Sequence, residues 1–407
     1  MKLKLKILAI MLIFLFCLQS FAYAVSVTAE SAILVEVSTG RIIYEKNSTK
    51  QMYPASTTKM MTAILVIENC DLQEIVTVSE TALQNIPTGY VTCDLSVGEE
   101  ISVNDLLYAL MVPSANDAAY VLAEHVAGSV DAFANMMNNK AREIGCTATH
   151  FVNPNGIHDS RHYTTAYDLY LIAKYCMQNE TFRNIVSTKE YTLPATNKHE
   201  AADRTFTTTN DLLNPEKTNY YKTAIGIKTG HTSMAGHCLV SESSREGLNF
   251  ISVVLNSESD NKRFSDSVNL FNYGYDNYTL TKVKEKNQLI ETIEIENATK
   301  ETANLDLLVD EEITVINNKS ITMDQIIPEI KLNEEISAPI TAGTVLGTIK
   351  YKVDDIEYSA NLIAKNDVIE KPDYSIFLVI VGILLLLIGF TILSRRKKVS
   401  RKRKRKK

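Results

Sequence analysis

Apolar and polar residues alternate in blocks that predict different secondary structures along the chain. Ala32–Val37 and Arg41–Glu45 are short apolar-rich runs joined by a Ser-Thr-Gly turn, which predicts a β-hairpin. Thr57–Asn69 carries apolar residues at helical spacing, and we expect this helix to begin at Ser56. Between about Val103 and Met177 apolar residues recur at steps of three and four, so this block is expected to be mostly helical.

Strand patterns return in the second half of the chain. Gly226–Lys228, His237–Ser241 and Asn249–Leu255 are β-rich, and Arg263–Tyr275 has the spacing of a closing helix. Strands at both ends with helices between them predict one α/β (α+β) domain over residues 25–277. In this domain distant segments would complete an antiparallel sheet beside a helical insert.

The pattern changes again beyond Tyr278. Short β-rich runs follow at Leu289–Ile295, Glu312–Val315 and Val345–Val353. They predict a separate small all-β domain over residues 278–370. No internal repeat is visible.

Both ends of the chain have the composition of targeting segments. Residues 1–24 contain three lysines, an apolar run and the small-residue pattern Ala22-Tyr23-Ala24, which is typical of a signal peptide. The uncharged apolar stretch 376–393 has 18 residues, near the minimum for a transmembrane helix. The basic tail 394–407 follows directly. By the positive-inside rule the tail is cytoplasmic, and residues 25–374 lie outside the cell membrane.

The charge distribution argues against nucleic-acid binding. The whole chain has a formal net charge of -6. Without the eleven basic residues of the tail and the three lysines of the leader, the remainder carries about -20. Since so acidic a surface repels nucleic acid, the basic tail is better explained as a topology signal, and we expect no nucleic-acid partner.

The predicted exported part contains an odd number of cysteines at wide, irregular spacing. They are Cys70, Cys93, Cys146, Cys176 and Cys238. The spacing matches neither metal-binding nor thioredoxin-like motifs. An exported chain can form disulfides, but one thiol must stay unpaired in a monomer, and small buried residues are the simplest interpretation of most of them.

Three short motifs place reactive residues in the predicted catalytic domain. They are Ser56-Thr57-Thr58-Lys59 at a helix start, Ser114-Ala115-Asn116 in a loop, and Lys228-Thr229-Gly230 on a late strand. Residues at i and i+3 share a helix face, so Lys59 can reach the Ser56 hydroxyl. A desolvated lysine near a second cation, here Lys228, has a lowered pKa and can act as the base that activates the serine.

The same motifs offer contacts for a substrate. Gly230 has no side chain, so a peptide backbone can lie against its strand edge. The backbone N–H groups of Ser56 and His231 are candidate donors to a developing oxyanion. Each motif alone is weak, because the first is often a solvated helix face, the second a turn or cap, and the third an ordinary turn. Their order and predicted placement together favour a serine acyl-transfer enzyme.

On these residues the sequence resembles the low-molecular-mass penicillin-binding proteins that act as serine-type D-Ala-D-Ala carboxypeptidases. The resemblance covers most of residues 25–365 and includes the longer blocks Tyr53–Thr62, Leu106–Ala119 and Gly226–Thr232. Ala338-Pro339-Ile340 and the glycines that follow it are similar to the C-terminal β domain of that family.

The resemblance implies a role for each motif residue. Ser56 would attack the carbonyl between the two terminal D-alanines of a peptidoglycan stem peptide, with Lys59 as its base. Ser114 would relay a proton to the leaving D-alanine, and Asn116 would hold the substrate amide. β-Lactams would acylate the same serine and act as inhibitors. The family requires no cofactor, and none is expected here.

The carboxylate site implied by the resemblance rests on Lys228 and Thr229. Relatives can add an arginine there, but Thr209 and Asn249 stand where one is expected. Relatives also read Asn-Pro-His-Gly where this chain has Asn153-Pro154-Asn155-Gly156, so no catalytic histidine is assigned to that loop. Some relatives use an amphipathic C-terminal helix as an anchor, whereas the apolar stretch here predicts a transmembrane helix.

Two other functions stay open on the same motifs. A serine β-lactamase needs a glutamate base in a loop between the second and third motifs, and no stretch of Glu143–Glu190 resembles that loop. A non-catalytic wall-binding or β-lactam-sensing protein would be indicated by degraded motifs, and none is degraded. His158 and His162 with Asp159 suggest a metal site, but the local sequence predicts a loop with a surface histidine pair, so no metal is expected.

Overall fold

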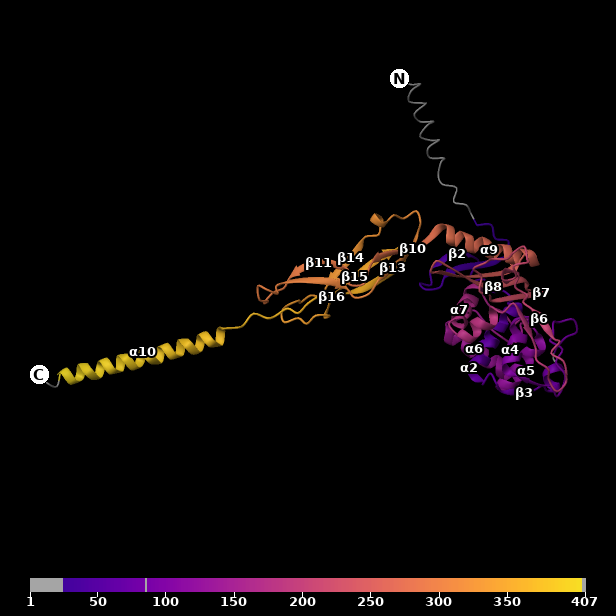
Figure 1. Cartoon of the computed structure of the whole chain (residues 1–407), viewed down its shortest axis with the longest axis horizontal. Helices are drawn as coiled ribbons and strands as arrows, with labels where there is room; N and C mark the ends of the chain where they lie inside the picture. The colour runs from indigo at the N-terminus through magenta and orange to yellow at the C-terminus, as the bar shows by residue number, and fades with distance from the viewer. Residues whose placement is uncertain (1–24, 85, 405–407) are drawn as a thin grey trace, which may run out of the picture. The chain divides into compact units, whose positions relative to one another are not determined.

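The computed structural model describes residues 25–84 and 86–404, so the predicted signal peptide lies outside the described residues. The chain forms two compact units. The first contains the residues up to Leu280 together with Asn318–Ser320, and the second contains Thr281–Asn317 and the residues from Ile321 onward. In Figure 1 the first unit is coloured indigo to orange and the second orange to yellow.

A five-stranded antiparallel sheet forms the centre of the first unit, with the strand order β2-β1-β9-β8-β7. Its strands are β1 Ser31–Glu36, β2 Ile42–Lys46, β7 Lys228–Thr232, β8 Gly236–Arg245 and β9 Leu248–Ser257. β1 pairs with β2 as the predicted hairpin, and on its other side it pairs with β9. The prediction that distant segments complete the sheet is therefore confirmed.

Helices cover both faces of this sheet (Figure 1). α9 (Asp260–Asn277) packs on one face, and α7 (Ala166–Met177) packs on the other. Successive residues of a strand point to opposite faces. Accordingly Phe250 of β9 contacts the ring of Tyr275 in α9, whereas its neighbour Ile251 joins the core of the helical insert.

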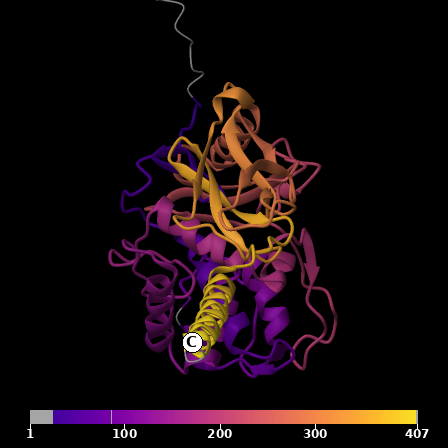
Figure 2. The same ribbon diagram turned by 90° about the vertical axis from the view of Figure 1, so that its left-hand side faces the viewer.

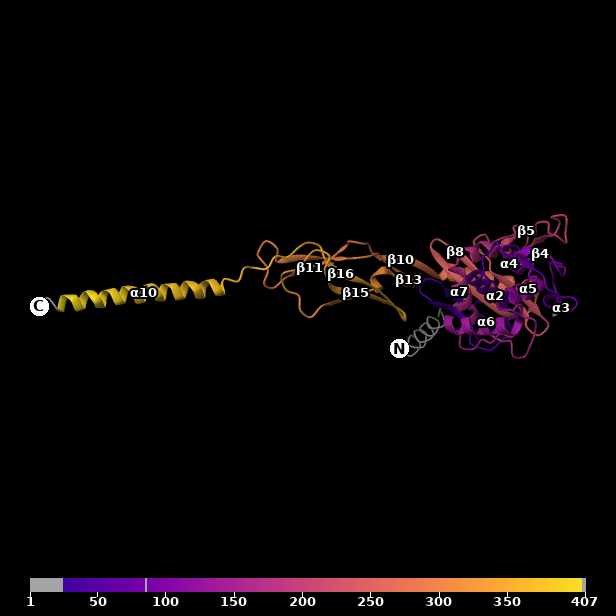
Figure 3. The ribbon, with the colours of Figure 1, turned by 90° about the horizontal axis from the view of Figure 1, so that it is seen from below.

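The helical insert packs around one apolar core on the α7 side of the sheet (Figure 3). Its helices are α2 Lys59–Asn69, α3 Glu80–Gln84, α4 Val103–Met111, α5 Asn116–Ala127, α6 Val130–Ile144 and α8 Glu180–Val186. Two short ribbons flank them, β3 (Ile75–Thr77) with β4 (Glu100–Ser102) and β5 (Glu190–Thr192) with β6 (Thr205–Thr207). The 3-10 turn η2 (Asp211–Leu213) lies between β6 and β7. The helical block predicted between Val103 and Met177 is confirmed.

Two predicted boundaries are wrong. The segment that contains Ser56 is not α-helical but a 3-10 turn, η1 (Ala55–Thr58), and α2 begins only at Lys59. The strand predicted at Gly226–Lys228 instead begins at Lys228. Ile225 and Ile227 still donate hydrogen bonds to β8, so the segment before β7 runs beside the sheet without completing a ladder.

The second unit is built from strands, as predicted. A five-stranded sheet has the order β11-β12-β16-β15-β14, and a second small sheet pairs β10 with β13. The elements are β10 Tyr278–Lys284, β11 Leu289–Glu294, β12 Asn304–Val309, β13 Ile313–Asn318, η3 Met323–Gln325, β14 Pro328–Leu332, β15 Val345–Val353 and β16 Ile356–Ala364. The long hairpin β15–β16 pairs without interruption from Gly347 to Val353.

A long helix, α10 (Ser375–Lys404), ends the described chain. Figure 2 looks along this helix, which is drawn in yellow. Its first part, Ser375–Ser394, contains an 18-residue window with a mean hydropathy of 3.2 and is long and apolar enough to cross a membrane. Twenty helical residues span about 30 Å, which matches the hydrocarbon thickness of a bilayer.

Candidate active site

Ser56 lies on a strained turn directly before α2. The preceding residue, Ala55, has a left-handed backbone with φ of 48°. Gly156 presses on this turn, because a Cβ added there would lie 1.8 Å from the Ala55 carbonyl oxygen. Left-handed backbone costs a residue such as alanine about 1–3 kcal/mol and is common at active sites. The turn is thus held in a specific conformation that presents Ser56.

Lys59, the first residue of α2, is completely buried and has three hydrogen-bond partners. Its Nζ lies 2.9 Å from Ser56 Oγ, 2.9 Å from Asn116 Oδ1 and 3.2 Å from the Asn155 backbone carbonyl. The two carbonyl oxygens can only accept, so they take two N–H groups of the amine. When Lys59 is neutral, its lone pair is therefore left for the Ser56 O–H.

The surroundings of Lys59 favour the neutral amine. Burial lowers the pKa of Lys59 well below its ordinary value, and the positive charge of Lys228 lowers it further, while Asp117 opposes the shift. The three hydrogen-bond partners are neutral groups, which do not hold a proton on the amine as a carboxylate would. Lys59 thus has the position expected of a general base, and its lowered pKa favours the neutral amine that can accept a proton.

The second motif supplies the residue that orients Lys59. Asn116 is the first residue of α5, and its backbone N–H and its side-chain Nδ2 both donate to the Val91 carbonyl, at 2.8 and 2.9 Å. These two bonds fix the amide group with Oδ1 toward Lys59. Ser114 lines the same cavity and has a left-handed backbone with φ of 71°. Its role as a proton relay stays a prediction.

The third motif forms one wall of the site on β7. Lys228 and Thr229 are buried. A Cβ at Gly230 would lie 2.9 Å from the Pro54 carbonyl oxygen and 3.1 Å from the Ser56 nitrogen. The strand can therefore approach the turn η1 this closely only because residue 230 is glycine. The sequence alone does not reveal this reason for Gly230. His231 lines the cavity, and its backbone N–H stays a candidate oxyanion donor.

An arginine that the sequence analysis missed completes this wall. Arg263 of α9 lines the cavity, and its guanidinium donates to the Gly230 carbonyl at 3.1 Å and pairs with Asp260 at 2.6 Å. Burial lowers the pKa of Lys228 to about 7, with a further contribution from the charge of Arg263. No local pattern marks Arg263, because the fold alone brings α9 to β7.

The two positions at which an arginine was expected have different locations. Thr209 lines the cavity, and its hydroxyl lies 2.6 Å from that of Thr229. Asn249 lies on β9, opposite Ser244 of β8, and is not among the cavity-lining residues described. Thr209 therefore adds a polar group to the predicted carboxylate site.

The motifs meet in one open cavity of about 410 Å³. Ser56, Ser114, Asn116, Thr229, Gly230 and His231 line it, together with Thr88–Val91. The described lining contains no Asp or Glu. Glu180 and Asn184 have the Glu-x-x-x-Asn spacing that a β-lactamase loop uses, but they lie on α8 and are not part of this lining.

The predicted surface histidine pair is wrong for His162, which is buried. Its Nδ1 accepts from the Val152 N–H, which leaves Nε2 to donate to the Thr58 hydroxyl at 2.9 Å. Burial lowers the pKa of His162 to about 3, so the ring is neutral. His158 instead packs edge-on against the Tyr53 ring. These two histidines thus contact residues on either side of Ser56.

The candidate metal ligands and the five cysteines discussed above all lie within residues 25–84 and 86–404. In this part of the chain no group of three or more His, Cys, Asp or Glu side chains is arranged to hold a metal ion. The five cysteines in it are free thiols, of which Cys70 is partly exposed and the others are buried.

Two family profiles match the sequence. Residues 19–259 match the family described as D-alanyl-D-alanine carboxypeptidase. Residues 278–370 match the C-terminal domain of penicillin-binding protein 5. One match thus falls in each of the two units.

Individual relatives agree with the profiles. The D-alanyl-D-alanine carboxypeptidase DacF of Bacillus subtilis is 30% identical over 357 residues, which is 86% of this chain and 88% of the relative. A D-alanyl-D-alanine carboxypeptidase of Streptomyces sp. strain K15 is 36% identical over 61% of this chain and 88% of its own length. The crystal structure of penicillin-binding protein 5 from Haemophilus influenzae covers 85% of this chain and 98% of its own, with a TM-score of 0.67 and 28% identity.

Proposed function

This chain belongs to the D-alanyl-D-alanine carboxypeptidase family, and we propose on that premise that it removes the terminal D-alanine from peptidoglycan stem pentapeptides through an acyl-enzyme on Ser56. The observation that carries the proposal is the contact between Lys59 Nζ and Ser56 Oγ at 2.9 Å, with two acceptor carbonyls on the other N–H groups of the amine. This arrangement supports transfer of the serine proton to lysine.

In the acylation step, the Ser56 O–H proton passes to neutral Lys59 while Oγ bonds to the carbonyl carbon of the penultimate D-alanine. The backbone N–H groups of Ser56 and His231 stabilise the resulting oxyanion. The C–N bond then breaks, and the leaving D-alanine nitrogen receives a proton from Lys59 through Ser114. An ester on Ser56 remains.

Substrate binding uses the wall formed by β7 and α9. Lys228, Thr229 and Arg263 receive the terminal carboxylate, because Thr229 and Arg263 line the cavity and Lys228 lies buried next to Thr229 on the same strand. Asn116 uses one Nδ2 hydrogen for Val91, which leaves the other for a carbonyl of the substrate peptide. Polar contacts of this kind orient the scissile bond over Ser56.

Deacylation returns the enzyme to its starting state. Water bonds to the acyl carbon while Lys59 takes a proton from it, and the ester C–O bond breaks with return of a proton to Ser56 Oγ. The net reaction consumes one water and releases D-alanine and the shortened peptide. β-Lactams acylate the same serine, and the resulting ester hydrolyses slowly, so they act as inhibitors.

We propose further that α10 anchors the enzyme in the cell membrane with the catalytic unit outside and the basic tail in the cytoplasm. The apolar part, Ser375–Ser394, supplies the span, and the basic residues that follow it set the orientation. Alkaline carbonate extraction of membranes should retain the full chain and release a chain that ends at Tyr374. Release of both would contradict the anchor.

The test of the activity uses the full-length chain purified in detergent. We expect incubation with benzylpenicillin to give a slowly decaying penicilloyl adduct by intact mass, and diacetyl-Lys-D-Ala-D-Ala to release D-alanine. Both signals should vanish in Ser56→Ala and persist in Ser187→Ala, a serine at the end of α8. Rapid penicillin turnover without D-alanine release would identify a β-lactamase, and neither signal would identify a non-catalytic binding protein.

A further inference from the structure

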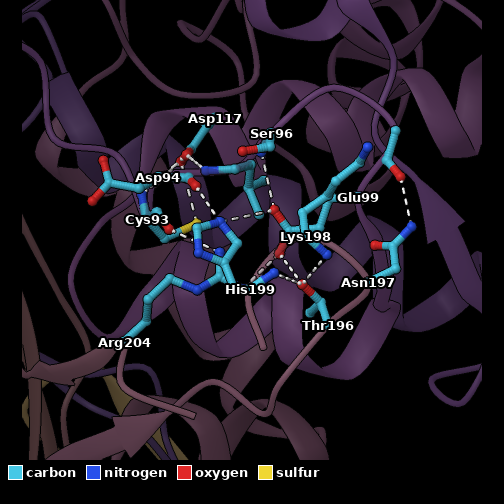
Figure 4. Close-up of polar contacts among 12 residues, drawn as sticks. Cys93, Asp94, Ser96, Glu99, Asp117, Thr196, Asn197, Lys198, His199 and Arg204 are labelled. Atoms are coloured by element: carbon cyan, nitrogen blue, oxygen red, sulfur yellow. Dashed lines mark hydrogen bonds and ion pairs between the residues drawn. The ribbon is translucent and has the colours of Figure 1, made fainter. Parts of the chain in front are cut away.

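Glu99 and Arg204 form a buried group of charged side chains outside the three motifs (Figure 4). Glu99 is completely buried, and the side chain of Arg204, its ion-pair partner, is only 8% exposed. Glu99 directly precedes β4, whereas Arg204 directly precedes β6, so residues about a hundred positions apart meet here. Neither residue has a part in the reaction steps described above.

The cavity wall beside this group has little apolar burial of its own. Residues 88–95, called here the wall segment, belong to no helix or strand, and four of them line the cavity. Within it only Cys93 and Leu95 are buried. A segment with so few buried side chains depends on polar contacts to keep its position.

The wall segment is bonded directly to the helix that carries Asn116. The Val91 carbonyl accepts both hydrogen bonds that orient the Asn116 amide. Next to it, the carboxylate of Asp117 accepts from the backbone N–H of Cys93 at 3.0 Å and of Leu95 at 3.1 Å. The position of the wall segment therefore fixes the amide that faces Lys59.

Arg204 and Glu99 hold the other side of the wall segment. Arg204 donates from Nη1 to the Cys93 carbonyl at 3.2 Å and from Nη2 to Glu99 Oε1. Glu99 in turn accepts from the Ser96 N–H at 3.0 Å and from the Thr196 hydroxyl at 2.9 Å. The guanidinium thus links the wall segment to a carboxylate that is itself fixed at both oxygens.

The loop that carries Arg204 makes further contacts to the same region. In residues 193–204, the connection between β5 and β6, His199 Nε2 lies 3.2 Å from the Asp94 carbonyl. Asn197 donates to the Gly98 carbonyl at 2.9 Å and accepts from the Glu100 N–H at 2.8 Å. This loop is therefore hydrogen-bonded to the residues directly before and after Glu99 (Figure 4).

We infer that Arg204, paired with Glu99, is a positioning residue for the catalytic base: it holds the wall segment so that the Val91 carbonyl keeps Asn116 Oδ1 on Lys59. A buried ion pair is weak evidence for stability, since its desolvation offsets much of its attraction, but it can select one conformation. The contacts that transmit this effect run from Arg204 to the Cys93 carbonyl, along the wall segment to the Val91 carbonyl, and through Asn116 to Lys59. This inference rests on the proposed function, because Lys59 must act as the base.

The test compares acylation rates of full-length variants with benzylpenicillin by intact mass. Arg204→Met keeps much of the side-chain volume but loses both donors, and we expect a 10- to 100-fold lower second-order rate constant, as displacements near 1 Å can cause. The matched control is Arg183→Met. Arg183 also joins a buried glutamate, Glu242 at 3.2 Å, and a backbone carbonyl, that of Met177 at 3.3 Å, but lies outside the cavity lining. Its variant should acylate at the wild-type rate.

A double-variant cycle separates positioning from general loss of structure. If Arg204 acts through Asn116, adding Arg204→Met to Asn116→Ala should lower the acylation rate constant by less than threefold. In the wild-type background the same substitution should lower it at least tenfold. Equal slowing in both backgrounds would overturn the inference, as would wild-type acylation by Arg204→Met. Failure of the wild-type chain to form any adduct would instead overturn the proposed function.

A second variant carries the test if Arg204→Met does not fold. Arg204→Lys keeps the charge beside Glu99, but a single ammonium cannot reproduce the planar fork that serves Glu99 and the Cys93 carbonyl together. We expect severalfold slower acylation with a circular dichroism spectrum like that of the wild type. Acylation at the wild-type rate by this variant would contradict the role assigned to the fork.

Discussion

The first unit buries charged groups in two different ways. At the cavity, Lys59 and Lys228 are buried without a carboxylate among the hydrogen-bond partners described for them, and the pKa of each is lowered. Behind the wall segment, Glu99 and Arg204 are equally buried but paired with each other. The paired charges keep one conformation of the wall segment, whereas burial without a carboxylate lowers the pKa of each lysine.

The difference has a thermodynamic reason. An unpaired buried amine loses the hydration of its charged form, so the cost of burial appears as a lowered pKa. A paired buried ion keeps its charge. Removing its partner leaves that charge buried and uncompensated, which lowers the free energy of unfolding. Substitution of a lysine should therefore reduce activity with little loss of stability, whereas substitution of one partner of the pair should reduce stability as well as the acylation rate.

The largest effect is expected at Lys59. Lys59→Met should lower the acylation rate by about 10³- to 10⁴-fold, because Lys59 is the hydrogen-bond partner described for the Ser56 hydroxyl. Its stability to urea should change less than that of Arg204→Met, since the variant no longer has to discharge a lysine on folding. Intact-mass kinetics and urea unfolding measure the two quantities, and a larger stability loss for Lys59→Met would break the comparison.

Removing one partner of the buried pair should also lower stability. Glu99→Leu leaves the Arg204 charge unpaired, and we expect about 3–5 kcal/mol less free energy of unfolding. Glu99→Leu with Arg204→Met removes both charges and should recover part of that loss. Urea unfolding of wild type, both single variants and the double variant checks this, and a double variant less stable than either single variant would count against a costly unpaired charge.

Loss of Arg263 should weaken recognition of the substrate carboxylate. A hydrogen bond to a charged group contributes about 1.5–3 kcal/mol, so Arg263→Leu should reduce the acylation efficiency by about 10- to 100-fold. The reduction should disappear for a β-lactam whose carboxylate is esterified. Arg161→Leu, at an arginine whose side chain is 74% exposed, serves as the control. An equal reduction for the acid and the ester would remove Arg263 from the carboxylate site.

The smallest effect concerns pH. Lys228 must be protonated to attract a carboxylate, and its pKa is about 7 in the free enzyme. Acylation efficiency should therefore fall about tenfold for each pH unit above 7, as one proton is lost. In Lys228→Arg the guanidinium stays charged, so this alkaline decline should move to higher pH. If acylation efficiency declined over the same pH range in Lys228→Arg, the decline would belong to another titrating group.

Much of the site could be predicted because it depends on short-range geometry. The spacing of Ser56 and Lys59 already places the base on the nucleophile, and the contact at 2.9 Å agrees with that prediction although η1, not an α-helix, carries the serine. The β1–β2 hairpin and the helical block follow from apolar periodicity alone. In each case the relevant interaction lies within a few residues.

The parts that could not be predicted depend on backbone groups and on distant segments. The carbonyls of Val91 and Asn155 bind Asn116 and Lys59, and a backbone carbonyl leaves no trace in the sequence. Arg263 reaches the cavity from α9 only because the sheet brings it there. His162 is buried because the loop around it folds back onto Thr58, a contact 104 positions apart.

The order of strands in the central sheet also determines when activity can arise during synthesis. β1 pairs with β9, so the hairpin made first must wait for residues 248–257 before its other edge is occupied. Closing so long a loop is slow, since its entropy is lost before the new contacts stabilise the chain. Ser56 and Lys59 emerge early but Lys228 and Arg263 emerge late. A growing chain is therefore inactive until nearly the whole first unit has been made, and cannot attack substrate while still incomplete.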